Sequence, residues 1–137
     1  MIVVAIIGVL AAIALPAYSD YTQRSKLAAS LISVDSYKTA VNVCFTDTGL
    51  LNGCNQNTND IPVGIAANDN GATINYVDSI TINNGIITLT STAIDSAANK
   101  LSLTLTPNVN STHITWDMTG SGCKLNNPAR GVDCSGN

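Results

Sequence analysis

The first fifteen residues carry no polar side chain, and this run constrains the fold more than any other feature of the 137-residue chain. A helix over residues 1–15 covers about 22 Å, whereas the hydrocarbon core of a bilayer is about 30 Å thick. Tyr18 and Tyr21 follow at the place where interfacial aromatic side chains commonly lie. The short length predicts that the chain begins inside a longer apolar helix. A short anchor in a locally thinned bilayer is the alternative.

The apolar run is not typical of a cleaved signal peptide. No Lys or Arg precedes it, and its Ala-rich end continues directly into a helical pattern. It also contains several small residues, which let helices approach closely in an apolar medium: Ala5, Gly8, Ala11, Ala12 and Ala14. Self-association of the helix and simple membrane anchoring both fit this composition, and the residues alone leave both open.

Beyond Tyr21 the apolar pattern narrows to one face of a continuing helix. Leu27, Leu31, Val34 and Val41 recur at spacings of four, three and seven, so they share one stripe. The change predicts two environments, with residues 1–22 as an apolar anchor or filament segment and residues 23–137 as a globular head. Pro16 lacks a backbone N–H, so we expect the helix to kink there or to loosen upstream, where Gly8 weakens it further.

Four strand-like segments follow a long polar stretch, residues 45–76, which shows no period and is predicted to be a loop. The segments cover residues 77–82, 86–92, 100–106 and 113–119, with Asn84-Gly85 typical of a tight hairpin turn. Pro107 is expected to end the third strand. These elements predict an α+β fold, in which a long N-terminal helix packs on the apolar face of a four-stranded antiparallel sheet.

Four cysteines occur as two locally spaced pairs, without a CxxC motif. An even number beside an export-type apolar segment predicts two disulfides formed in an oxidising compartment. Four cysteines allow three pairings. Cys44–Cys54 and Cys123–Cys134 are favoured because these partners are nearest in sequence, and each loop would stabilise the fold by roughly 2–3 kcal/mol in the chain-entropy model. The second pair would close a loop over the edge of the sheet.

Catalytic, metal and nucleic-acid sites find little support in the composition. The single histidine, His113, falls on a solvent-facing strand position, and no GxSxG nucleophile motif occurs. Asp60, Asp69 and Asp78 could offer oxygen ligands to calcium, but they lack EF-hand spacing and are better explained as solvated loop residues. Six basic residues are scattered in a chain of net charge −3, which argues against nucleic-acid binding by the subunit. We therefore expect no enzyme activity, cofactor or metal.

The first 26 residues closely resemble the N-terminal helix of type IVa pilins of the PilA-like kind. The resemblance rests on the order of the apolar run, on Gly8 and Pro16, and on the exit Ala17-Tyr18-x-Asp20-Tyr21. The later paired cysteines, the Thr- and Ile-rich strands and the terminal cysteine loop follow the family layout. Mature members begin several residues earlier, with a methylated residue and a nearby Glu. This sequence contains no Glu, so neither role can be assigned to a residue here.

The resemblance implies a structural subunit that waits in the inner membrane, is extracted by the pilus assembly machinery and polymerises with identical copies into an extracellular pilus. It implies that the region from Gly8 to Pro16 loses helical order in the filament. The residues expected in the filament core are Ile2, Val3, Ala5, Ile6, Ile7, Val9, Leu10, Ile13 and Leu15.

The fibre would serve adhesion, twitching motility, biofilm formation or DNA uptake. The terminal loop, with Lys124 and Arg130, is the candidate contact surface for other subunits or a host receptor, although it would also act as a staple for the sheet edge. An alternative is a pseudopilin of a type II secretion system, which shares the helix. A membrane-anchored periplasmic binding module is a further alternative from another class.

Overall fold

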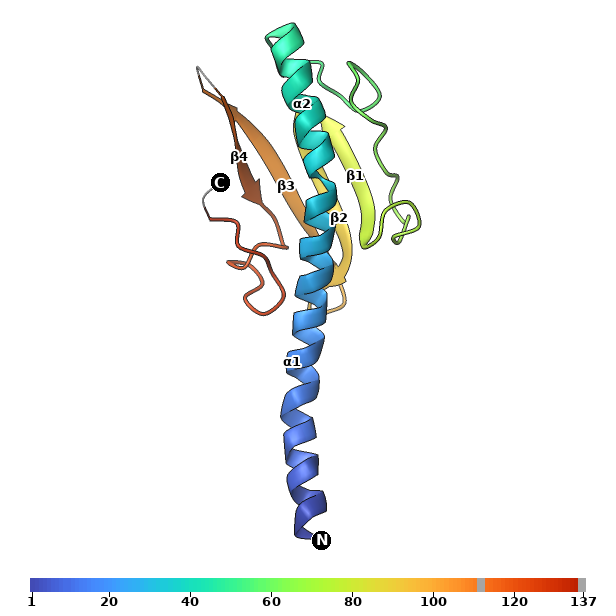
Figure 1. Cartoon of the computed structure of the whole chain (residues 1–137), viewed down its shortest axis with the longest axis vertical. Coiled ribbons are helices and arrows are strands. Elements are labelled where there is room, and N and C mark those ends of the chain that lie inside the picture. The colour runs from blue at the N-terminus through green and yellow to red at the C-terminus, as the bar shows by residue number, and fades with distance from the viewer. Residues whose placement is uncertain (111–112, 136–137) are drawn as a thin grey trace.

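The computed structural model of the chain describes residues 1–110 and 113–135 and contains one long helical rod lying on a four-stranded sheet (Figure 1). The rod consists of α1 (Ile2–Ser33) and α2 (Asp35–Thr48), which are separated at Val34. Hydroxyl groups of Ser30 and Ser33 donate to the carbonyls of Leu27 and Ala29, a pattern that bends helices. The helix predicted as one element is therefore two helices that are almost continuous.

The predicted apolar stripe faces the sheet. Leu27, Val34 and Val41 are each 0% exposed. The buried face is wider than predicted, because Tyr37 and Cys44 are also buried. Buried side chains thus recur every three or four residues of the rod from Leu27 to Cys44, about one in each turn.

The sheet has the order β1-β2-β3-β4, and every neighbouring pair is antiparallel: β1 (Val77–Asn83), β2 (Ile86–Ile94), β3 (Lys100–Val109) and β4 (Ile114–Thr119). Asn84 and Gly85 connect β1 to β2 with φ values of 48° and 79°, which are the positive values that a two-residue hairpin turn requires. The predicted α+β fold, with a long helix on a four-stranded antiparallel sheet, is confirmed.

Side chains alternate across the sheet as a half-buried strand requires. On β3 the buried face consists of Leu101, Leu103 and Leu105, each at most 1% exposed. Ile87 and Leu89 of β2 lie on the same side of the sheet and are fully buried. The opposite face carries half-exposed threonine and serine side chains, so the core forms a single layer between sheet and helix.

Two boundaries predicted from the sequence are wrong. Pro107 does not end β3, which continues to Val109 and pairs Pro107 with Trp116 of β4. The paired residues of β2 reach no further than Leu105 along β3, so the missing N–H of Pro107 costs no bond on that side. The helix also does not end near Cys44, because α2 continues to Thr48 and stops at Gly49, whose φ of 73° forms a left-handed cap.

Asp78 was predicted to be a solvated loop residue, and this is wrong. It lies in β1, at a register shift between Val77 and Ser79, and it is only 4% exposed. Such a bulge turns a side chain from its regular direction. The Asp78 carboxylate accepts a hydrogen bond from Lys100 Nζ at 2.7 Å and another from the backbone amide of Asn70 at 3.1 Å. An ion pair therefore fastens the long loop to β1 and β3.

The predicted disulfide pairs both form, Cys44 with Cys54 and Cys123 with Cys134. The first joins α2 to the loop over residues 49–76. That loop is partly ordered against β1, where Ile65 and Ile80 exchange backbone hydrogen bonds of 2.8 and 3.0 Å. The loop therefore covers the β1 edge of the sheet. The second disulfide lies beyond β4, where Gly122 N donates to Ser102 O of β3.

Candidate functional site

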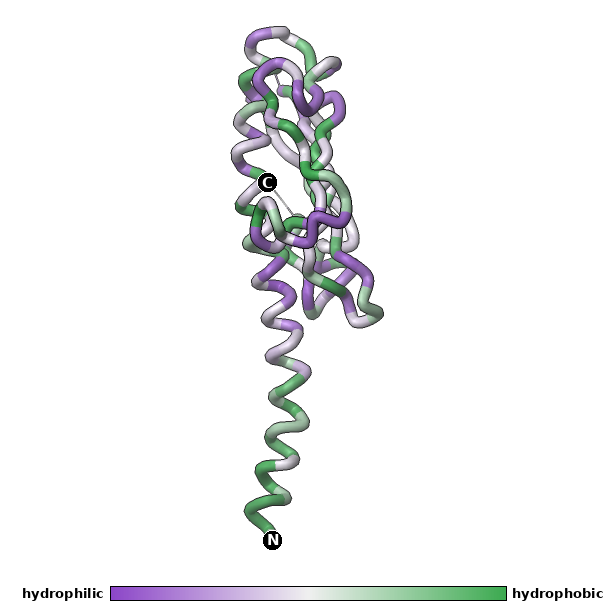
Figure 2. Tube along the Cα trace, turned by 90° about the vertical axis from the view of Figure 1, so that its right-hand side faces the viewer, coloured by the Kyte–Doolittle hydropathy of each residue, from purple (hydrophilic) through white to green (hydrophobic). Residues whose placement is uncertain are grey.

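The part of α1 outside the head is the most unusual surface of the molecule. We call residues 2–19 the stalk. Every residue of the stalk is exposed, and the helix in which it lies has a mean hydropathy of 2.4 in its most apolar window. By length and composition it could cross a membrane. Figure 2 shows this apolar segment projecting from the more polar head.

The residues predicted for the filament core all lie on the stalk, and its large apolar side chains have exposed fractions between 54% and 78%. They surround the helix rather than forming one stripe. Apolar exposure on this scale indicates contact with a membrane or with other protein. No stalk residue is buried by the head.

Gly8 and Pro16 both lie within continuous helix. α1 runs through Pro16 without a break, so the single chain shows no loosening at this site. Proline removes the donor to the carbonyl four residues earlier, which leaves this turn weaker than its neighbours. The loss of helical order between Gly8 and Pro16 in a filament therefore stays a prediction.

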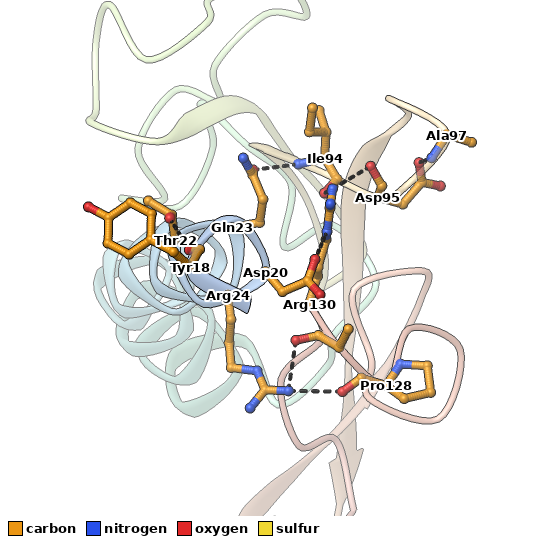
Figure 3. A network of polar contacts seen from close by, with 11 residues as sticks. Tyr18, Asp20, Thr22, Gln23, Arg24, Ile94, Asp95, Ala97, Pro128 and Arg130 are labelled. Carbon is orange, nitrogen blue, oxygen red and sulfur yellow. Dashed lines mark hydrogen bonds and ion pairs between the residues drawn. The ribbon is translucent and has the colours of Figure 1, made fainter. Parts of the chain in front are cut away.

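A group of polar contacts begins where the stalk meets the head (Figure 3). The guanidinium of Arg130 donates from Nε to Asp20 Oδ1 of α1 at 2.6 Å. Its Nη1 donates to the backbone carbonyls of Ile94 and Asp95, in the turn after β2, at 3.0 and 2.6 Å. One side chain of the terminal loop thus connects α1 with the β2–β3 turn. We call this arrangement the junction clamp.

Two further side chains of α1 support the junction clamp. Gln23 Oε1 accepts a hydrogen bond from the amide of Ile94 at 3.0 Å. Arg24 Nη2 donates to the carbonyls of Pro128 and Ala129, each at 2.9 Å. The predicted boundary after residue 22 therefore falls inside a connected region, in which residues 20–24 of α1 already bind the head.

Arg130 was predicted, with Lys124, to be a surface contact residue, but its side chain is only 15% exposed. It is engaged within the subunit. Lys124 remains exposed beside Leu125, which is 92% exposed. Together with Met118 and Asp133 they line a cavity of about 570 Å³ between the end of β4 and the terminal disulfide. This cavity is the accessible part of the predicted contact loop.

The turn after β2 is itself held by Asp95. Its carboxylate accepts hydrogen bonds from the backbone amides of Asn99 and Ala97 at 2.9 and 2.8 Å. The bonds from Asn99, first from its backbone and then from its side chain, lower the pKa of Asp95, and those from Ala97 and the charge of Arg130 act in the same direction. The clamp therefore binds a turn whose backbone is itself held by hydrogen bonds to the Asp95 carboxylate.

Among the described residues, no three His, Cys, Asp or Glu side chains gather as a metal site would require. His113 is exposed just before β4. The sequence Asn110-Ser111-Thr112, which matches the N-glycosylation pattern and equally fits a turn between strands, lies partly outside the described residues.

Sequence reasoning missed Asp20, Gln23 and Arg24 as functional residues. Their spacing of three and four places them on one side of α1, just after the apolar run, and this was the available signal. Their partners lie 71 to 110 residues away in the sequence. A local sequence pattern cannot predict partners at such distances.

The molecule thus consists of an exposed apolar helical stalk and an α+β head with its own core. The sequence model of the family described as Pilin (bacterial filament) matches residues 23–134. The chain therefore belongs to the pilin family. This is a family of structural filament proteins and not of enzymes.

Curated relatives of the chain agree with this family assignment. The chain is 37% identical over 123 residues to the fimbrial protein EcpC of Eikenella corrodens, a match covering 85% of this chain and 75% of the relative. It is 38% identical to the type IV major pilin protein PilE1 of Neisseria gonorrhoeae, over 64% of this chain but 38% of PilE1. Prepilin peptidase-dependent protein D of Escherichia coli is 33% identical, over 78% and 66% of the two chains.

A solved structure supports the fold. The solution structure of the major type IV pilin PpdD from enterohemorrhagic Escherichia coli matches with a TM-score of 0.56 at 24% identity. The match covers 73% of this chain and 70% of that one. This match supports the fold of the chain.

Proposed function

We propose that this chain is the structural subunit of a type IV pilus and that it polymerises with identical copies through its stalk. One observation carries the proposal: the stalk exposes a complete apolar cylinder while the head has its own closed core. Burial of each large apolar side chain stabilises by about 1.5–3 kcal/mol against water. The isolated subunit cannot keep such a surface in water.

Two apolar surroundings would cover the exposed surface of the stalk, one before assembly and one after it. In the inner membrane, lipid tails would surround its 18 residues, about 27 Å of helix. In the fibre, the stalks of neighbouring subunits would take the place of lipid. Both media are apolar, so the free energy of moving the stalk from lipid to the fibre would be close to zero. The packing between neighbouring stalks would then decide which state is favoured. This balance would let the assembly machinery add subunits to the fibre base and return them to the membrane.

The heads would then form the outer surface of an extracellular fibre. Heterologous contacts between identical subunits that do not close into a ring generate open helical filaments. The polar outer face of the sheet would meet water, and the cavity beside Lys124 and Leu125 would remain accessible for contact with another head or a receptor. Adhesion, twitching motility, biofilm formation and DNA uptake are the roles that such a fibre would support.

The proposal is tested by imaging fibres from cells that carry a type IV pilus assembly system and the full-length chain. We expect long extracellular fibres that shear removes, with residues 2–19 packed in the core at side-chain resolution. Short periplasmic assemblies produced only with a type II secretion system would identify a pseudopilin instead. Protein that stays monomeric in the membrane under both conditions would contradict filament assembly.

A further inference from the structure

Arg130 lies inside the loop that the Cys123–Cys134 disulfide closes, and this places a covalent bond behind the junction clamp. The two cysteines are 11 residues apart. The clamp partners of Arg130 are all outside that loop, on α1 and on the β2–β3 turn (Figure 3). A staple that only protected the sheet edge would have no need of these distant contacts.

The backbone directly after Arg130 is fixed by two short hydrogen bonds, one within the loop and one to the residue that precedes it. Gly131 N donates to Asn127 O at 2.7 Å, and Val132 N donates to Gly122 O at 2.8 Å. Gly131 also has no room for a side chain, because a Cβ atom would lie 2.6 Å from Asn127 O. Arg130 therefore projects from a rigid platform rather than from a free loop.

That rigidity matters for a long side chain. Arginine has about 2 kcal/mol of rotamer entropy, and a planar guanidinium is most effective when its acceptors lie in fixed directions. Here one acceptor is the Asp20 carboxylate and two are backbone carbonyls of the β2–β3 turn. If the platform moved, the three acceptors could not be met at once.

Asp20 is the first residue after the stalk, so this contact acts on the direction in which the stalk leaves the head. Arg24 strengthens the connection, since its guanidinium binds the carbonyls of Pro128 and Ala129, directly before Arg130. Two arginines thus join α1 to the terminal loop: Arg130 of the loop donates to α1, and Arg24 of α1 donates to the loop. Opening the loop would release both at the same time.

We propose that the terminal disulfide acts at a distance: by holding Arg130 in the junction clamp it fixes the stalk to the head. A small dithiol would reduce this bond by thiol–disulfide exchange, leaving Cys123 and Cys134 as thiols while the dithiol itself becomes a disulfide, and this would free the junction. The arrangement is a redox-sensitive joint between the two parts of the subunit. It would operate in the unpolymerised chain, whether or not that chain builds a fibre.

Hydrogen exchange of the full-length chain in detergent micelles tests this joint. The probe is the backbone amide of Ile94, which lies outside the disulfide loop and donates a hydrogen bond to the Gln23 side chain of α1. We compare Arg130→Ala, the pair Cys123→Ser with Cys134→Ser, and the triple variant. We expect Ile94 exchange to be at least tenfold faster in each, with no further gain in the triple variant.

The matched control is Lys124→Ala, which removes an exposed positive charge from the same loop without touching the clamp. Exchange at Ile94 should stay unchanged. If the cysteine pair speeds exchange at Lys124 and Val132 but leaves Ile94 at its original rate, the disulfide is a local staple and the proposal is wrong.

A second measurement keeps the disulfide and so does not depend on how the serine variants fold. Coupling between two sites is reciprocal. Loss of the clamp in Arg130→Ala should therefore shift the reduction equilibrium of Cys123–Cys134 in a thiol redox buffer toward the dithiol, by about threefold to tenfold, with Arg130→Lys between the two. Equal reduction equilibria in Arg130→Ala and the original chain would overturn the proposal, while a loss of fibres alone would not.

Discussion

The stalk and the sheet-covering part of the helical rod are made from the same kind of backbone, yet they use apolar residues in opposite ways. Stalk side chains such as Ile2 and Ile13 are 78% and 69% exposed, whereas Leu27 and Val34 are fully buried. The sheet needs one stripe from the helix, and the remaining faces meet water. The stalk has apolar residues all round, as the packing that we propose for stalks in a fibre would require.

This contrast means that the two parts should respond independently to substitution. A change in the stalk should remove assembly and leave the head folded. A change in the core of the head should lower stability while the stalk stays apolar. Five substitutions test this comparison, and they are given in order from the largest expected effect on the molecule to the smallest.

Ile6→Asp, in the middle of the stalk, should have the largest effect. A carboxylate at the centre of an apolar helix costs about 2.5–3.5 kcal/mol on insertion scales, which corresponds to roughly a hundredfold loss of assembled subunit. The fraction of protein recovered in sheared fibres measures the change. Ser25→Asp puts the same charge on an exposed face of α1 beside the head and should leave assembly intact. Equal losses in the two variants would contradict the division into stalk and head.

Leu103→Ala should have the next largest effect, in the head alone. The side chain is 0% exposed on β3, and truncation of a buried leucine costs about 2–5 kcal/mol. Thermal or denaturant unfolding of the head, followed by near-UV circular dichroism of Trp116, measures it. Leu125→Ala removes the same atoms from a residue that is 92% exposed and should change stability by less than about 0.5 kcal/mol.

Asp78→Asn should lower head stability by about 1–3 kcal/mol at neutral pH, because Lys100 loses its charged partner. Burial raises the pKa of Asp78, but hydrogen bonds from Lys100 and the amide of Asn70 outweigh it and hold the pKa below its ordinary value. A lowered carboxyl pKa gives stability that is complete above the unfolded pKa of about 4 and is lost as pH falls through the folded pKa. The gap between the variant and the original chain should therefore close in acid. A gap that is constant with pH would show that charge plays no part.

Two glycine substitutions give the smallest effects and should differ in sign. Gly49 caps α2 with a φ of 73° and has open space around it, so Gly49→Ala carries only backbone strain of about 1–2 kcal/mol. Gly8 lies in the helical stalk, where Gly8→Ala should stabilise the helix by about 0.5–1 kcal/mol. Unfolding of the head measures the effect of Gly49→Ala, and circular dichroism of the chain in micelles measures the helicity change in Gly8→Ala. Destabilisation of the stalk by Gly8→Ala would contradict a regular helix there.

Much of the fold followed from the sequence because it depends on local periods. The stripe of Leu27, Val34 and Val41 repeats with a helix, and Leu101, Leu103 and Leu105 alternate as a strand does. The hairpin at Asn84-Gly85 was recognisable because few residues accept positive φ. The exposed stalk needed only its composition.

The junction clamp and the buried ion pair depended on contacts between distant segments. Arg130 is 110 residues from Asp20, and Lys100 is 22 from Asp78. Lys124 and Arg130 look alike in the sequence, yet one is exposed and the other is bound to α1. Pro107 looked like the end of a strand because its neighbours in the sheet were unknown.

Local patterns in the sequence were enough to place the apolar surface: on every side of the first helix, on one stripe of its continuation and on one face of each strand. They could not separate exposed charges from those that are bound within the subunit, because the partners of a polar side chain come from whichever segment folds against it. In this pilin, the fold brings Arg130, which the sequence predicted as a surface contact, to Asp20 of α1, where the head meets the stalk.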